Sequence, residues 1–212
     1  MKTLVRALAI GFLFAVVASL TEETGTSGHV AVWLSRTDMM VIRQSVKADF
    51  AAMLAIVNDA ARAYRGVIPA DRWHEPYMPA DELAREIAGG VVFWVAEQEG
   101  RLSGVMGIQD KGDVALVRHA YVAPTTQRTG VGTRLLRHVE ALVEKPVLIG
   151  TWAAASWAIE FYRRNGFTVV PSGDKDRLLR TYWSIPARQI DTSVVLANRR
   201  WMEVQPRASA GS

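Results

Sequence analysis

The segment 127–133 has the residue types of an anion-binding loop. Its members are Gln127, Arg128, Thr129, Gly130, Val131, Gly132 and Thr133. An apolar run stops at Pro124 just before it and a helical pattern begins near Val131, so the segment lies at a helix start. There the backbone N–H groups lack partners and the helix dipole is positive, while Gly130 and Gly132 have no Cβ atom to keep an anion away. The residues predict a diphosphate-binding loop, with an ordinary glycine turn as the alternative.

Other phosphate-binding patterns are absent from the sequence. It contains no G-x-x-x-x-G-K-[ST] motif, which argues against nucleotide hydrolysis, and no G-x-G-x-x-G motif after the first expected strand, which disfavours a dinucleotide-binding fold. It also contains no cysteine, which excludes disulfides, thiolate zinc sites and cysteine nucleophiles.

A second motif follows downstream, where segment 158–167 reads A-I-E-F-Y-R-R-N-G-F. Together with Q-x-x-G-x-G at 127–132, after Y-V-A-P at 121–124, it resembles the linked motifs of the GNAT superfamily of N-acetyltransferases. Two motifs at the family's spacing are more specific than either one. The resemblance covers roughly residues 41–196 and implies an α/β GNAT fold, in which a mixed central sheet of six to seven strands is flanked by about four helices.

The resemblance implies that acetyl-CoA is the co-substrate. Loop 127–133 would hold its diphosphate, and backbone groups at Tyr121 and Val122 would pair with the pantetheine arm in a gap between two parallel strands. A backbone N–H at this strand end would polarise the thioester carbonyl. Tyr162 would donate a proton to the departing thiolate, since an ordinary tyrosine is protonated at neutral pH. The alternative is that Tyr162 is a half-buried aromatic without such a role.

The implied activity is direct transfer of an acetyl group to a primary amine of a small molecule or peptide, and this amine must lose a proton. Leu116, Arg118 and Ala120 share the expected strand face with Val122, and none of them is a base. His119 is one residue out of this register, so we expect it to face the other side of the sheet as a structural or surface histidine. Water is therefore the expected proton acceptor.

The second motif departs from the family pattern at Ala155, where many members carry an asparagine three residues before the motif alanine. With this contact missing and no evident base, the alternative function is a non-catalytic, acetyl-CoA-binding GNAT module with a regulatory role.

The acceptor amine is expected beside the first helix and the aromatic loop that follows it. Tyr64, Trp73 and Tyr77 are the candidate substrate-binding residues, and the alternative is that these aromatics pack the loop onto the sheet. Four nearby carboxylates could hold an ammonium group: Asp71, Glu75, Asp81 and Glu82. Aromatics with few acids favour a small or moderately apolar amine over a polycation. A homodimer is compatible with the resemblance.

Hydrophobic periodicity indicates the elements that must position these residues. Strands are expected at 41–46, 91–97, 102–109, 114–122, 147–151, 167–170 and 189–196, and helices at 49–64, 81–88, 131–143 and 154–165. The strand–helix–strand order in the middle of the chain predicts parallel pairing there. The sheet is therefore expected to be mixed, within one domain at 40–198.

The composition fits one ordinary domain with tails. Of 212 residues, 50% are apolar and 22% charged, so a core can form. The net charge is +4, but the basic residues are scattered, which does not indicate a nucleic-acid partner. Residues 199–212 are expected to form a disordered C-terminal tail.

Residues 1–39 read as an apolar N-terminal extension and linker. Lys2 and Arg6 precede an apolar run at 7–20, as in a secretory signal, and the run is short for a membrane span. The alternatives are a signal peptide, a membrane anchor that would tether an interaction protein, or sequence upstream of the true start near Met39–Met40. Because acetyl-CoA is an intracellular metabolite, the expected location is cytoplasmic, with membrane anchoring or export through residues 1–20 as the alternative.

Overall fold

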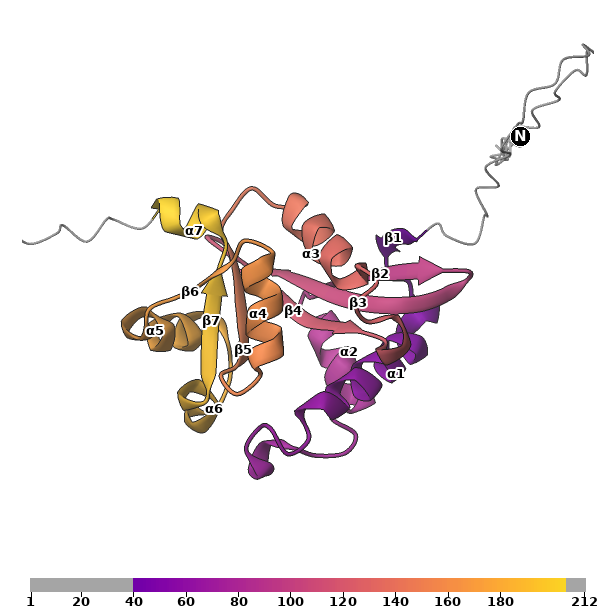
Figure 1. Ribbon diagram of the computed structural model, residues 1–212, viewed down its shortest axis with the longest axis horizontal. Helices are drawn as coiled ribbons and strands as arrows, with labels where there is room; N and C mark the ends of the chain where they lie inside the picture. Colours follow the sequence, from indigo (N-terminus) through magenta and orange to yellow (C-terminus); the bar gives the residue numbers. More distant parts are fainter. Residues whose placement is uncertain (1–39, 205–212) are drawn as a thin grey trace, which may run out of the picture. The chain divides into compact units, whose positions relative to one another are not determined.

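Seven strands form one mixed sheet in the part of the chain that the computed structural model describes, residues 40–204 (Figure 1). The strands are β1 Val41–Gln44, β2 Val92–Gln98, β3 Arg101–Asp110, β4 Ala115–Val122, β5 Val147–Trp152, β6 Thr168–Val169 and β7 Ser193–Ala197. Their order across the sheet is β1-β2-β3-β4-β5-β7-β6. Only β4 and β5 pair in parallel among these strands, which confirms the parallel pairing expected at the middle of the chain.

Seven α-helices flank this sheet within residues 40–204. They are α1 Phe50–Ala61, α2 Ala80–Ala88, α3 Val131–Ala141, α4 Ser156–Arg164, α5 Ser172–Tyr182, α6 Ala187–Asp191 and α7 Arg199–Val204. Short 3-10 turns occur at Lys47–Asp49, Arg62–Tyr64, Ala70–Arg72 and Pro124–Thr126. The expected fold class is therefore confirmed, with more helices than the four expected.

Alternating side chains of β4 divide the core between the two faces of the sheet. Ala115 and Val117 pack with residues of α3 and α4 on one face, whereas Leu116 packs on the other face with residues of α5 to α7. Tyr121, further along β4, packs against a cluster from α1 and α2 on that second face. The helices thus form a layer on each side of the sheet (Figure 1).

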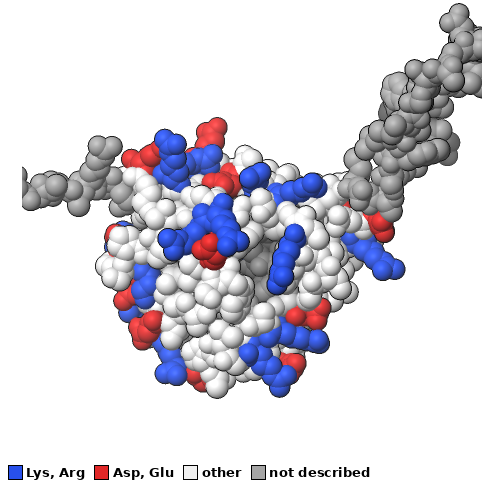
Figure 2. All heavy atoms as spheres, viewed as in Figure 1, with Lys and Arg blue, Asp and Glu red and all other residues white. Residues whose placement is uncertain are grey.

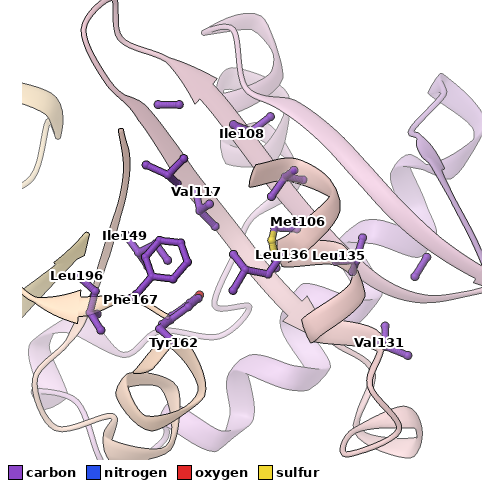
Figure 3. Packing of buried hydrophobic residues seen from close by; sticks show 14 residues of the cluster. Met106, Ile108, Val117, Val131, Leu135, Leu136, Ile149, Tyr162, Phe167 and Leu196 are labelled. Carbon is purple, nitrogen blue, oxygen red and sulfur yellow. The ribbon is translucent and has the colours of Figure 1, made fainter. Parts of the chain in front are cut away.

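The α3 helix shows why these patterns fold as they do. Its apolar positions recur at helical spacing, and Leu135 and Leu136 are fully buried against the sheet (Figure 3). Burying one such side chain contributes roughly 1.5–3 kcal/mol. The packing holds the N-terminus of α3 at the end of β4, where the predicted anion-binding loop lies.

The segment between β6 and β7 differs from the sequence-based expectation. The strand expected at 189–196 starts only at Ser193, because Ala187–Asp191 forms α6, and residues 172–182 form α5, which was not expected. Helix α5 buries only Leu178 and Leu179 within an otherwise polar stretch, so its periodicity is weak. Both helices follow a proline, Pro171 and Pro186, at the N-cap position.

The C-terminal prediction is wrong for residues 199–204, which form α7 instead of a disordered tail. The reason is Trp201, whose side chain is buried against the cluster of α5 and β7. The expected signal-like segment 1–20, the linker and the last residues of the tail lie outside the described part of the chain. Within residues 40–204, no helix has both the length and the apolar character that crossing a bilayer requires.

Candidate active site

Strands β4 and β5 pair only at their first residues and then part. Their parallel register joins Ala115 to Val147, Leu116 to Leu148 and Val117 to Ile149, whereas β4 continues to Val122 and β5 to Trp152. A cavity of about 400 Å³ lies where the strands diverge, and its walls include Val117 and Tyr121 of β4 and Gly150 to Trp152 of β5. The divergence leaves room for an extended ligand arm between the two strands.

The predicted anion loop lies at the far end of β4 and opens α3. Gly130 is the N-cap residue with φ of 90°, and Arg128 also has a positive φ, 64°. The Thr129 hydroxyl donates to the Thr126 carbonyl at 2.7 Å, and the Gln127 amide donates to the Val122 carbonyl at 3.3 Å. No side chain among the described residues caps the helix start, so its first N–H groups have no side-chain acceptor and are available to an anion.

Gly132 brings the two sequence motifs together. A Cβ atom at this position would lie 3.3 Å from the Phe161 ring of α4 and 3.4 Å from the Val122 side chain. Only a small residue allows the first turn of α3 to approach α4 and β4 so closely. The loop and the motif around Tyr162, which are separate in sequence, are therefore adjacent in the fold.

Tyr162 is buried among the residues of this packing region. Its ring contacts Phe161, with ring centroids 5.1 Å apart, and lies 6.2 Å from the ring of Phe167. Figure 3 shows its hydroxyl end pointing towards Leu136. Burial raises the pKa of Tyr162 above its usual value, with a smaller contribution from Tyr64. The hydroxyl therefore stays protonated over the whole physiological pH range.

A β-bulge in β4 interrupts the expected alternation of its side chains at His119. Val105 pairs with Tyr121 and Gly107 pairs with Arg118, so two residues of β4 stand opposite the single residue Met106. His119 is the extra residue, with φ of 50°. His119 lies opposite Val122 and Ala120, as expected, but the cavity is on its side of the sheet, beside Tyr121. Unbroken alternation was wrong for Arg118, which the bulge places on the same side as His119.

The same bulge changes the environment of the other β4 side chains. Ala120 and Val122 were expected to face the substrate, but they pack against the α3 and α4 side of the core. Arg118 and Tyr121 line the cavity on the opposite face. The absence of a base in the expected register is therefore no longer an argument against a protein base.

Glu86 of α2 holds His119 in the cavity wall. The Nε2 atom of His119 lies 3.1 Å from Oε2 of Glu86, and Arg118 donates to Oε1 of the same carboxylate at 2.8 Å. Burial would raise the pKa of Glu86, but the contacts with His119 and Arg118 outweigh burial and lower it below the usual value. Glu86 is thus ionised, and a proton accepted by His119 would form a charge-stabilised pair.

Aromatic residues form much of the cavity wall. The rings of Tyr64 and Tyr77 are stacked with centroids 5.9 Å apart, and Trp152 donates from Nε1 to the Tyr77 hydroxyl at 3.4 Å. Burial raises the pKa of Tyr64 to about 12. Two of the three residues predicted to bind the acceptor therefore line the cavity, but Trp73 lines a smaller hollow on the other side of the loop.

Several cavity residues were missed by the sequence analysis. Glu86 and Trp152 lie on regular elements whose pattern was read, but nothing in one sequence shows which cavity they face. Trp183 belongs to the connection between α5 and α6, and this segment had no predicted structure. A tryptophan and two prolines, Pro171 and Pro186, in a polar stretch were the available signal for a folded connection.

The surface charge is distributed in patches. Figure 2 shows Lys and Arg side chains on this face in several separate groups, with acidic and uncharged residues between them. Several of the basic residues are paired, as Arg164 is with Glu160 and Arg177 with Asp174. This face offers no continuous basic surface of the kind that binds a nucleic-acid backbone.

Comparisons with known proteins agree with the fold and the motifs. The acetyltransferase (GNAT) domain profile matches residues 89–169. An amino-acid acetyltransferase of Ralstonia nicotianae is 27% identical over 156 residues, which are 73% of this chain and 32% of that protein. The chain thus spans about a third of that relative's length. The peptidyl-lysine N-acetyltransferase YiaC of Escherichia coli is 24% identical over 145 residues, 68% of this chain and 93% of that protein.

Solved structures show the same fold. The PaiA N-acetyltransferase of Thermoplasma acidophilum, solved in complex with coenzyme A, superposes with a TM-score of 0.57 at 17% sequence identity. The match covers 76% of this chain and 98% of that protein. The GNAT domain profile over residues 89–169, the shared fold and the two linked motifs, which lie side by side in the structure, agree in pointing to the GNAT superfamily of acetyltransferases.

Proposed function

We propose that the protein is an acetyl-CoA-dependent N-acetyltransferase that acetylates a primary amine of a small molecule or peptide by direct transfer. The observation that carries this proposal is the divergence of β4 and β5 between an uncapped helix start and an aromatic cavity. The helix start would bind a diphosphate, and the cavity on the other side would bind the acceptor. The gap between them is where a thioester would meet an amine.

Each part of the cofactor has a candidate partner in this chain. The N–H groups of the loop at 127–133 would hold the diphosphate, with Arg128 as a further cation. Backbone groups of β4 near Tyr121 and Val122, beyond the part that pairs with β5, would pair with the pantetheine arm. The solved complex of the Thermoplasma acidophilum relative with coenzyme A supports a ligand of this class.

The proposed reaction uses two protonatable groups on opposite sides of the gap. The amine nitrogen forms a bond to the thioester carbon as the carbon–sulfur bond breaks. His119 accepts the proton from the amine and Glu86 stabilises the resulting imidazolium. Tyr162 donates its proton to the leaving thiolate. His119 thereby takes the role that the sequence analysis assigned to water.

The same chain could instead bind acetyl-CoA without turnover, as a regulatory module. The position of Ala155, which offers no polar side chain beside α4, favours this second function. Acetyl-CoA binding by calorimetry and release of CoA thiol in the presence of an amine panel distinguish the two. Tight binding with no thiol release for amino acids, polyamines, aminoglycosides and peptides would reject the enzyme.

We also propose that residues 40–204 contain the whole catalytic unit and that it acts in the cytoplasm, where acetyl-CoA is available. N-terminal sequencing of the native protein after cell fractionation tests this. Membrane-bound chains that retain residues 1–20 would contradict it.

A further inference from the structure

An ion pair between two segments distant in sequence lies at one side of the cavity. Arg188 of α6 contacts both oxygens of Asp71, with Nε 3.1 Å from Oδ1 and 3.0 Å from Oδ2. Asp71 lies in the 3-10 turn Ala70–Arg72, so the pair joins α6 to the aromatic loop at the rim of the cavity. Such an exposed pair contributes little stability. It does mean that the negative charge of Asp71 is partly neutralised by Arg188.

Arg72 is left with an incompletely satisfied guanidinium that faces the cavity. Its Nε atom is buried and forms no hydrogen bond within residues 40–204, although Oδ2 of Asp71 is 3.3 Å away. Asp71 is already shared with Arg188, so the three side chains carry one net positive charge. The Arg72 side chain is 29% exposed and lines the cavity, so a carboxylate on a bound molecule would pair with the accessible part of its guanidinium in the geometry that arginine prefers.

The opposite charge comes from α2. Glu82 and Glu86 are one helical turn apart and both line the cavity. Glu86 already contacts Arg118 and His119. Arg85 pairs with Asp81 outside the cavity. Glu82 is therefore without an ion-pair partner among the described residues. The cavity therefore carries one unneutralised cation and one unneutralised anion on different walls.

Trp183 supplies an apolar part of the cavity wall. Its ring lies on the backbone of Gly150, where a Cβ atom would be only 3.2 Å from Cε2 of the indole. The stacked rings of Tyr64 and Tyr77 and the side chain of Trp152 form the facing aromatic surface. These flat surfaces favour a planar or branched apolar group over a hydrated, charged chain.

We propose that the acceptor is an α-amino acid with an apolar or aromatic side chain, with Arg72 binding its carboxylate, Glu82 its ammonium group and Trp183 its side chain. This assignment rests on the proposed acetyltransferase function. An amine without a carboxylate leaves the charge of Arg72 without a partner, and a polycation is repelled by that positive charge. The site therefore selects a zwitterion and discriminates against both of these amines.

The test compares each of the twenty L-amino acids with the corresponding amine that lacks the carboxylate, using CoA-thiol release. For the pair L-phenylalanine and 2-phenylethylamine, we expect kcat/KM to be at least about tenfold higher for the amino acid. Arg72→Gln should lower kcat/KM for phenylalanine about tenfold and leave phenylethylamine within about twofold. Arg85→Gln is the matched control, because Arg85 lies outside the cavity, and it should change neither substrate.

Glu82→Gln should raise KM for both amines, and Trp183→Ala should reduce the preference for aromatic over small amino acids. Thermal unfolding of every variant shows whether it is folded. A carboxylate-free amine that outperforms all amino acids, or an Arg72→Gln effect equal for both members of the pair, overturns the inference and leaves the acetyltransferase function intact. Acetyl-CoA binding without thiol release from any amine would instead reject the proposed function itself.

Discussion

The Nε2 atom of His119 lies 3.1 Å from the Oε2 atom of Glu86, and the contact joins the bulge of β4 to the cavity face of α2. Arg118, next to His119 in sequence, donates to the other oxygen of the same carboxylate. The carboxylate thus holds two neighbouring β4 side chains on one side of the sheet. An imidazole supported in this way can accept a proton and keep its orientation.

Replacing His119 tests whether it is the proton acceptor. We expect His119→Gln to lower kcat/KM for the amine about a hundredfold, because general-base catalysis typically contributes 10²–10⁴-fold. The measurement is thiol release at saturating acetyl-CoA. His138→Gln serves as the control, since His138 lies on α3 against Trp94, with ring centroids 4.3 Å apart, and outside the cavity. Equal rates for the His119 variant and the wild-type protein would indicate that water, and not His119, accepts the proton.

Tyr162→Phe removes a hydroxyl while keeping the buried ring. We expect kcat to fall at least about tenfold, because the thiolate would leave without its proton donor, and the dissociation constant for acetyl-CoA to stay within about twofold. Tyr182→Phe is the matched control, because the Tyr182 hydroxyl donates a hydrogen bond to Asp113, away from the gap between β4 and β5. A parallel loss of cofactor binding and turnover would show that Tyr162 is structural.

The raised pKa of Tyr162 predicts the alkaline side of the pH profile. A donor must keep its proton, and a pKa above the usual value of about 10 keeps the hydroxyl protonated throughout the range below it. We therefore measure kcat/KM from pH 6 to pH 10 for the wild-type protein and for Tyr162→Phe. We expect that any decline seen in the wild-type protein is also present in the variant. A decline centred below pH 9 that disappears in this variant would contradict the assignment.

Gly130 tests the anion loop independently of chemistry. Its φ of 90° disfavours any residue with a Cβ atom, at a cost of about 1–2 kcal/mol. Gly130→Ala should therefore distort the helix start and raise the dissociation constant for acetyl-CoA about tenfold. Gly112→Ala is closely matched, with φ of 87° in the turn between β3 and β4, and should lower stability without changing affinity. Equal affinities in both variants would place the diphosphate elsewhere.

Asp49 predicts a pH-dependent contribution to stability. It accepts from Nη1 and Nη2 of Arg43 at 2.7 and 2.9 Å and from the Val46 N–H at 2.7 Å. The Arg43 hydrogen bond lowers the pKa of Asp49, although burial opposes it. The charged form therefore stabilises the fold above about pH 4, and this stability is lost as the pH falls through the lowered folded-state pKa.

We expect Asp49→Asn to reduce the free energy of unfolding by about 2 kcal/mol at pH 7. The difference from the wild-type protein should shrink below about pH 4, where the carboxylate takes up its proton. Urea unfolding at both pH values measures it. Asp59→Asn is the exposed control and should change little at either pH. A difference independent of pH would show that charge is not the cause.

The parts of the site that depend on local sequence were predictable. Gly130 and Gly132 predict a close approach of the backbone because they have no side chain. The motif around Tyr162 lies at the family's spacing from this loop. The position of Arg118 on the same face as His119 was not predictable, because a bulge is set by pairing with β3 and leaves no mark in β4 itself. Nor did the sequence show that the cavity lies on this face and not on the face of Val122. The α5–α6 segment was missed because its buried residues are few, and with it the wall formed by Trp183.

The bulge also means that the number of residues in β4, and not only their identity, sets the chemistry of the cavity. Removing His119 would pair Ala120 directly with Met106 and leave Arg118 and Tyr121 facing the cavity as before. A deletion of one codon would therefore take out the imidazole and leave its surroundings in place. Insertion or loss of a single residue is thus a step by which a chain of this architecture can gain or give up a histidine at this point without turning its neighbours away from the cavity.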